Sequence, residues 1–212
     1  MSHFSIFYYL VLSFIYILAI PYLIFKSRNS KYRQAIPAKF FLKDNVPFKE
    51  NGIWFHSCSM GETKAIKPLI DNYLENANIS VITNTGFEEA KKISPNVRYL
   101  PFEIFLPFWV NKKKVLVVME AELWYLLFLL AKKKGAKTLL INARISDKSY
   151  KSYKRFSFFY KRIFQNIDKV FAQSEVDKHR LEELGASNVE VIGNIKLAQL
   201  PKVNVKLEKP KQ

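Results

Sequence analysis

One acidic residue, Glu62, lies where a strand is expected to turn into a helix. The apolar run 53–57 suits a buried strand, and the small residues Ser59 and Gly61 follow it directly. An acid in the first turn of a helix faces unpaired backbone amides, whose partial positive charge favours its ionised form. Such a carboxylate at the end of a parallel strand can act as a general base toward a substrate hydroxyl. The alternative is that Glu62 only stabilises the start of the helix.

Further polar residues follow the other apolar runs in the same way. Because parallel strands end at one edge of a sheet, side chains placed just after them can converge on one rim. Acidic and basic side chains together at this rim would suit a site for an oxygen nucleophile and an anionic ligand. The alternative is that these strand ends are polar only because they meet water. The candidates are Ser59 and Glu62, Thr83 and Thr85, Glu120 and Glu122, Asn142 and Arg144, Gln173 and Ser174, and Asn194 and Lys196.

The elements that must position these residues alternate along the chain. Short apolar runs separated by amphipathic stretches predict an α/β domain with a parallel, Rossmann-like sheet. Residues 34–51 contain two prolines and an Asn among short apolar patches, and we interpret them as a loop or docking segment. The expected strands are 53–57, 79–83, 97–100, 115–119, 138–141, 170–172 and 189–192, and the expected helices are 62–76, 86–92, 103–111, 122–134, 149–166 and 175–184.

The N-terminal segment 4–25 carries no charged residue. As a helix it would extend about 33 Å at roughly 1.5 Å per residue, which matches a bilayer core of about 30 Å. A cleaved signal peptide is disfavoured because no basic region precedes the apolar run. The bases Lys26, Arg28, Lys31 and Arg33 follow it, so the positive-inside rule places the next domain in the cytoplasm. We expect an anchor helix over 4–25, a domain over 34–198 and a linker over 199–212.

Composition narrows the partners and the chemistry. The 212 residues contain 34 Lys and Arg against 18 Asp and Glu, a net charge of +16, which implies an anionic partner: nucleic acid, acidic lipid or a phosphorylated substrate. Cys58 is the single cysteine, so an internal disulfide and a thiolate zinc cluster are both excluded. We interpret Cys58 as a structural thiol, and we expect neither a metal site nor a cofactor.

Five short blocks follow one another along the chain: Ser59-Met60-Gly61-Glu62, Met119-Glu120-Ala121-Glu122-Leu123-Trp124, Asn142-Ala143-Arg144-Ile145-Ser146, Ala172-Gln173-Ser174-Glu175 and Gly193-Asn194-Ile195-Lys196. In this order they resemble the 3-deoxy-D-manno-octulosonic acid (Kdo) transferases of lipopolysaccharide synthesis. The resemblance implies the N-terminal, acceptor-side half of a GT-B glycosyltransferase, whose second domain binds the donor nucleotide and is expected to be absent here. It also implies transfer of Kdo from CMP-Kdo to the lipid A precursor, lipid IVA, at the inner membrane.

The resemblance also implies roles for single residues. Glu62 matches the general base, and Glu120 and Lys196 match positions that stabilise the transition state of an inverting transfer. Tyr125 departs from the family, which usually has proline after Glu-Leu-Trp. The remaining motif residues are expected to bind substrate: Ser59, Gly61, Arg144, Gln173, Ser174 and Asn194.

A basic and aromatic segment, 148–162, adds a possible surface for anionic inner-membrane lipid or for acceptor phosphates. A solvated basic helix face is the alternative. Interleaved bases and aromatic rings also suit single-stranded nucleic acid, but a membrane anchor argues against that partner. A second hypothesis for the whole chain is a non-catalytic, membrane-tethered module that binds acceptor only.

Overall fold

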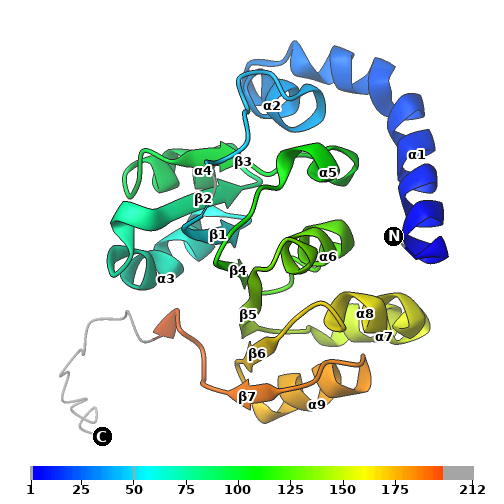
Figure 1. The fold of residues 1–212 in the computed structure, drawn as a ribbon, viewed down its shortest axis with the longest axis vertical. Helices are drawn as coiled ribbons and strands as arrows, with labels where there is room; N and C mark the ends of the chain where they lie inside the picture. Colours follow the sequence, from blue (N-terminus) through cyan, green and yellow to red (C-terminus); the bar gives the residue numbers. More distant parts are fainter. Residues whose placement is uncertain (1, 50, 198–212) are drawn as a thin grey trace, which may run out of the picture.

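A seven-stranded, fully parallel sheet forms the centre of the protein, as shown in a computed structural model that describes residues 2–49 and 51–197 (Figure 1). The strand order is β3-β2-β1-β4-β5-β6-β7. The expected α/β class with a parallel, Rossmann-like sheet is therefore confirmed. The strands are β1 (Ile53–Ser57), β2 (Ala77–Val81), β3 (Val97–Tyr99), β4 (Val115–Met119), β5 (Lys137–Ala143), β6 (Lys169–Ala172) and β7 (Val189–Val191).

Both faces of the sheet are buried, because helices cover each of them. Successive side chains along a strand point to opposite faces and therefore belong to two separate cores. In β4, Leu116 and Val118 belong to one apolar core, whereas Val117 and Met119 belong to the other. Helices α3 (Met60–Asp71) and α4 (Asn84–Lys91) cover the second core. Helices α6 (Tyr125–Lys133), α8 (Ser157–Phe164) and α9 (Glu175–Glu183) cover the first.

Two expectations about the helices are wrong. The segment 34–51 contains the helix α2 (Ala35–Phe41), whose residues Ala35 and Ala38 pack into the core beside α3 and α4. The long helix expected over 149–166 is divided at Phe156 into α7 (Asp147–Arg155) and α8. Short one-turn elements also occur: η1 (Ser30–Tyr32), η2 (Leu74–Asn76), η3 (Glu103–Phe105) and α5 (Leu106–Trp109). Residues 199–212, the expected linker, lie outside the described residues.

The strand order reverses direction between β1 and β4, and this point defines where a ligand can bind. In open parallel sheets the crevice lies beyond the carboxyl ends of the strands on either side of such a reversal. Glu62 follows β1 and Glu120 follows β4. The turn after β1 is packed tightly, since a Cβ placed on Gly86 of α4 would come within 3.2 Å of the Cys58 carbonyl oxygen.

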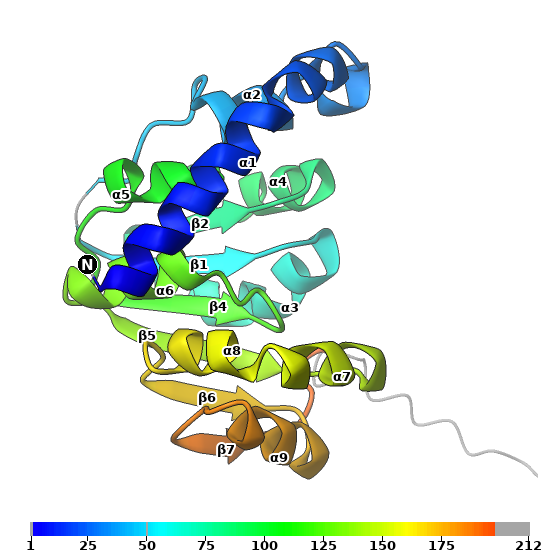
Figure 2. The same cartoon turned by 90° about the vertical axis from the view of Figure 1, so that its right-hand side faces the viewer.

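The N-terminal helix α1 (His3–Ser27) lies along the domain, beside α5 and α6 (Figure 2). It is long and apolar enough to cross a membrane. Four of its hydroxyl groups reach the domain. Ser5 Oγ is 2.8 Å from the Tyr125 hydroxyl, and Tyr8 donates to the Glu103 carboxylate. Tyr9 donates to Ile104 O and Tyr16 donates to Phe40 O.

Candidate active site

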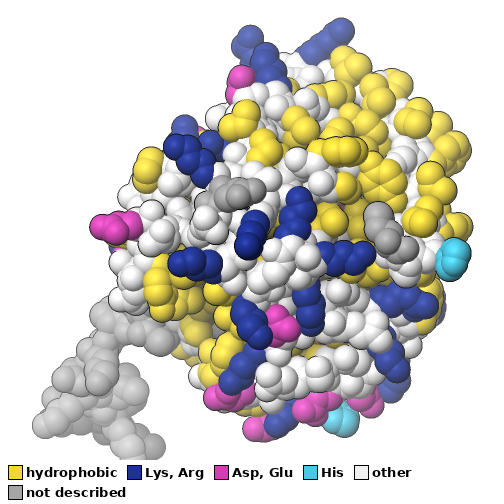
Figure 3. All heavy atoms as spheres, in the orientation of Figure 1, with side chains coloured by type: hydrophobic (Ala, Val, Ile, Leu, Met, Phe, Trp, Pro, Cys, Tyr) yellow, Lys and Arg dark blue, Asp and Glu magenta, His cyan; other side chains and the backbone are white. Residues whose placement is uncertain are grey.

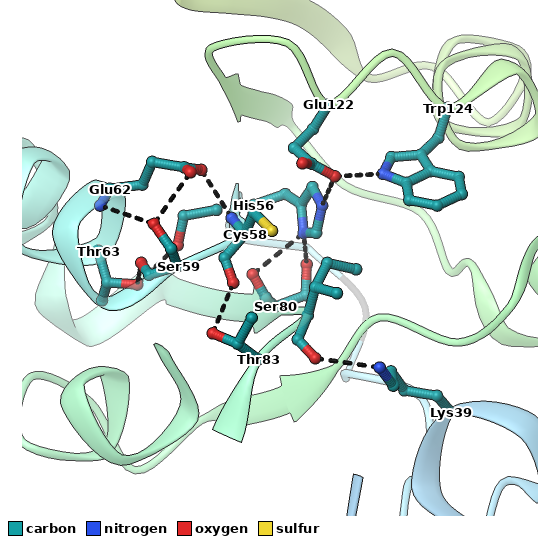
Figure 4. A network of polar contacts seen from close by, with 12 residues as sticks. Lys39, His56, Cys58, Ser59, Glu62, Thr63, Ser80, Thr83, Glu122 and Trp124 are labelled. Carbon is teal, nitrogen blue, oxygen red and sulfur yellow. Dashed lines mark hydrogen bonds and ion pairs between the residues drawn. The ribbon is translucent and has the colours of Figure 1, made fainter. Parts of the chain in front are cut away.

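The Glu62 side chain is fixed at the start of α3 by two hydrogen bonds. The Cys58 backbone N–H donates to Oε2 over 2.7 Å, and the Ser59 hydroxyl donates to Oε1 over 3.0 Å (Figure 4). Ser59 also caps the helix by accepting the Glu62 backbone N–H. The residues of this turn therefore hold the carboxylate in one orientation at the carboxyl end of β1.

The environment of Glu62 makes it a stronger base than an ordinary glutamate. Burial raises the pKa of its carboxyl group, since water is largely excluded from it. The bonds from Cys58 and Ser59 act in the opposite direction, whereas the negative charges of Glu120 and Glu122 add to the rise. A carboxylate whose pKa lies above its ordinary value takes a proton more readily, which is the property required of a general base.

A second carboxylate, Glu122, lies on the other side of Cys58 (Figure 4). The Trp124 indole N–H donates to its Oε2 over 2.7 Å, and His56 Nε2 is 3.8 Å from the same oxygen. Burial alone would raise the pKa of Glu122, but the His56 imidazole and donation from Trp124 and the Cys58 thiol lower it below its ordinary value. Glu122 is therefore held in its charged form.

Cys58 links the two carboxylates, with its backbone amide on Glu62 and its thiol beside Glu122. Burial and the two negative charges raise the pKa of the thiol to about 12. At neutral pH the thiol is protonated, so it is a poor nucleophile. This agrees with its interpretation as a structural thiol.

His56 lies fully buried in β1. Its Nδ1 is 2.8 Å from Ser80 Oγ and 3.1 Å from the Ser80 carbonyl oxygen. Its Nε2 has no hydrogen-bond partner among the described residues and faces Glu122. The imidazole is therefore a buried group that supports the Glu122 side of the site.

A third group of residues joins the ends of β4, β5 and β7. Lys196 forms an ion pair with Glu120. The Asn142 side chain donates to Glu120 Oε1 over 3.3 Å and accepts the Ile195 backbone N–H over 3.1 Å. Asn142 thereby ties Glu120 to the chain segment that carries Lys196.

Glu120 and Asn142 both have left-handed backbones, with φ of 54° and 53°. Residues other than glycine adopt this conformation at a cost of about 1 kcal/mol or more, and such strain concentrates at functional sites. The left-handed conformation of these two residues ends the regular strand geometry of β4 and β5. Glu120 and Lys196, which the sequence places on the same rim, are in direct contact.

The other predicted residues have different surroundings. Gln173 donates to the Asn142 carbonyl oxygen over 3.0 Å, and Asn194 accepts the Lys196 backbone N–H, so both support the Glu120 group. Ser174 caps α9 by accepting the Asp177 N–H. Arg144 is exposed and has no hydrogen-bond partner among the described residues. At Gly61 an added Cβ would meet no atom within 4 Å, so its backbone is open to the rim.

Sequence reasoning placed Asn142 on the rim but did not include it among the site residues, and the same is true of Glu122. For Glu122 the signal was present, since it lies two residues after Glu120 in the same strand-end block. For Asn142 the signal was only its place at the carboxyl end of β5. Its link to Ile195 joins residues 53 positions apart in the sequence, which no local pattern reveals.

Fold and site together define a Rossmann-like α/β domain with carboxylates at its switch point. Residues 28–199 match the family model described as 3-deoxy-D-manno-octulosonic-acid transferase (kdotransferase). The chain belongs to the Kdo transferase family. A transferase of this name from Chlamydia pneumoniae is 31% identical over 210 residues, which cover 91% of this chain and 48% of that protein.

Two other relatives show the same partial coverage. A bifunctional glycosyltransferase/methyltransferase from Fusobacterium nucleatum is 35% identical over 165 residues, covering 70% of this chain and 26% of that protein. A 3-deoxy-D-manno-octulosonic acid transferase from Rickettsia bellii is 34% identical over 158 residues, covering 69% of this chain and 38% of that protein. The chain thus spans about half or less of the length of these relatives.

Proposed function

We propose that this chain is the acceptor-side domain of an inverting glycosyltransferase that moves Kdo from CMP-Kdo to the lipid A precursor, lipid IVA. Family membership supports the class of reaction. The observation that carries the assignment is the fixed, buried Glu62 carboxylate at the end of β1, adjacent to the reversal of strand order. No metal or cofactor is required by this proposal, in which CMP-Kdo is a substrate that a second domain would hold.

In the proposed reaction, an acceptor hydroxyl oxygen attacks the anomeric carbon of Kdo and its proton passes to Glu62. The bond from the anomeric carbon to the CMP phosphate breaks, and the phosphate oxygen keeps the electron pair. Positive charge that develops on the sugar would be opposed by Glu120. Lys196, which forms an ion pair with Glu120 in the structure, would stabilise anionic oxygen on the donor.

Substrate recognition would fall to residues on the same rim. Arg144 has an exposed guanidinium without a partner among the described residues, so it can meet a carboxylate or phosphate. Ser59 and the open backbone at Gly61 lie beside Glu62. The contribution of Gln173 and Asn194 would be indirect, because both support the residues around Glu120. Ser174 would act from the start of α9, which it caps. We further propose that α1 attaches this domain to the cytoplasmic face of the inner membrane, in contact with anionic lipid.

The test is a transfer assay with CMP-Kdo and lipid IVA, supplying the C-terminal half of a full-length relative in cis or in trans. Glu62→Gln should lower transfer by roughly 10²–10⁴-fold, the usual contribution of a general base. Glu88→Gln is the matched control, because Glu88 is exposed on α4 away from the carboxylates. Transfer by Glu62→Gln at the rate of the control would remove Glu62 from this role.

A second candidate is a membrane-tethered module that binds acceptor without catalysis. It predicts that lipid IVA binds to the chain and that no transfer occurs when a donor half is supplied. Binding together with transfer would favour the first proposal. The two candidates use the same rim residues and differ in whether Glu62 acts as a general base.

A further inference from the structure

The side chains of helix α1 that face the domain include its hydroxyl groups, whereas those that face outward are apolar. The residues that contact the domain recur at helical spacing, and Ser5 and Leu23 are buried. The polar groups of the helix lie on this inner face: Ser5 and Tyr9 bond to the domain, and Tyr8 donates to the Glu103 carboxylate. Tyr16 continues the face by donating to Phe40 O over 2.6 Å.

The outward face of α1 is apolar over its whole length. A helix on a water-soluble domain has the opposite arrangement, with apolar residues inward and polar residues outward. Hydrophobic side chains gather over this helix in the space-filling view (Figure 3). The exposed apolar and aromatic residues of α1 are Ile6, Phe7, Leu10, Val11, Phe14, Ile15, Ile17, Leu18, Tyr22, Ile24 and Phe25.

The apolar surface continues from α1 onto the neighbouring helices. Phe7 and Val11 line a groove together with Phe156 and Phe158, which lie where α7 meets α8. Phe156 and Phe158 are themselves about half exposed. A continuous apolar surface of this length is larger than soluble monomers normally expose, and it indicates contact with lipid.

Basic side chains lie at both ends of α1. At its N-terminal end the Arg162 guanidinium is 4.3 Å from the Phe4 ring centroid, and Lys133 lines the adjoining pocket. At its C-terminal end Lys26 lies in the last turn and Arg28 follows. If the docked helix crossed a bilayer, Arg162 and Lys133 would have to enter or cross the hydrocarbon, which is costly for charged side chains.

We propose that α1 lies along one leaflet of the membrane, docked on the domain, rather than across the bilayer. Its outward face, with Phe156 and Phe158, is immersed at the boundary between headgroups and acyl chains of an anionic leaflet. The bases at both ends of the helix meet the negative lipid headgroups. Both ends of α1 are then on the same side of the membrane as the domain. This inference concerns the mode of attachment and is independent of the sugar transferred.

The test maps the side of the membrane on which the N-terminus lies. A cleavable epitope tag is added before Met1, and Lys148→Cys on the exposed surface of α7 reports the side of the domain through an impermeant maleimide. The matched control for labelling is the chain without that substitution, whose only thiol is Cys58. Inverted inner-membrane vesicles and spheroplasts of a Gram-negative host are compared.

We expect the tag to be cut, and Lys148→Cys to be labelled, in inverted vesicles only. Cleavage of the tag in spheroplasts, with Lys148→Cys labelled in inverted vesicles, would show that α1 spans the bilayer and would overturn the proposal. Failure of the chain to sediment with membranes would overturn it too. None of these outcomes depends on transferase activity, so they leave the proposed sugar transfer untouched, whereas failure to sediment would also overturn the proposed attachment through α1.

Partitioning onto vesicles containing phosphatidylglycerol tests the immersed face directly. Phe14→Asn on the outward face should lower the partition coefficient roughly tenfold, because a fully buried Phe contributes about that factor. The matched variant Tyr16→Phe on the docked face should partition as the unsubstituted chain does. Equal loss in both variants, or loss in Tyr16→Phe alone, would contradict the assignment of the two faces.

Discussion

Glu103 offers the sharpest test of the electrostatics, because replacing a buried acid by its neutral analogue should stabilise the protein. Its side chain is 3% exposed. Oε1 accepts the Leu126 backbone N–H at the start of α6 over 2.6 Å, and Oε2 accepts the Tyr8 hydroxyl of α1. Burial, opposed by these hydrogen bonds, raises the pKa of Glu103 from 4.5 to about 7.

The size and sign of the effect follow from this shift. Below about pH 4.5 the carboxyl is protonated in both the folded and the unfolded chain. Between about pH 4.5 and 7 the unfolded chain ionises first, so the free energy of unfolding falls as pH rises. A difference of about 2.5 pKa units corresponds to about 3 kcal/mol, all of it lost by pH 8. Glu103→Gln mimics the protonated acid and should escape this loss.

The assay is denaturant unfolding in detergent micelles at pH 4.5 and pH 8. Glu103→Gln should match the unsubstituted chain at the lower pH and exceed its stability by up to about 3 kcal/mol at the higher pH. Glu88→Gln, on the exposed side of α4, controls for the loss of one negative charge. If Glu103→Gln is destabilised at pH 8, the ionised carboxylate is needed for its hydrogen bonds and the assumption that burial dominates is refuted.

Three further predictions concern the active site. With its pKa near 12, Cys58 should react with iodoacetamide at pH 8 far more slowly in the folded chain than in the unfolded chain, as mass spectrometry would show. When the C-terminal half of a relative is supplied in cis, the acid limb of the pH profile of kcat/KM should lie above pH 4.5, because the pKa of Glu62 is raised. Glu122→Gln should move this limb to lower pH by removing a negative neighbour of Glu62, and an unmoved limb would contradict that coupling. Glu120→Gln and Lys196→Met should each lower kcat by roughly 10²–10³-fold. The double variant should lose little more than either single one, and additive losses would argue against a shared role.

The sequence was sufficient for the sheet and for much of the rim. Short apolar runs alternating with amphipathic stretches leave few arrangements besides a parallel α/β sheet. Once the strands are parallel, every residue just after a strand is on one edge, which is why Glu62 and Glu120 could be placed near each other. Their partner Lys196 follows β7 in the same way. These inferences depend on local pattern and topology alone.

Long-range and polar details could not be obtained in this way. The prolines of 34–51 suggested a loop, but Pro37 occupies the first turn of α2, where its missing N–H costs nothing. Ser174 was expected to meet substrate, and no sequence pattern that we used showed that its hydroxyl also accepts the Asp177 N–H at the start of α9. For α1, hydropathy alone could not separate its two faces, since the inner face is polar only through hydroxyl groups.

The reversal of strand order between β1 and β4 also explains how two carboxylates, each held by different contacts, come to lie at one edge of the sheet. Glu62 begins a helix and receives the Cys58 amide and Ser59 hydroxyl, so its position is set by α3. Glu120 lies on a strained turn and is held by Asn142 and Lys196, so its position is set by β5 and the segment after β7. Independent elements therefore control the two side chains, so the hydrogen bonds that position Glu62 do not depend on the ion pair between Glu120 and Lys196.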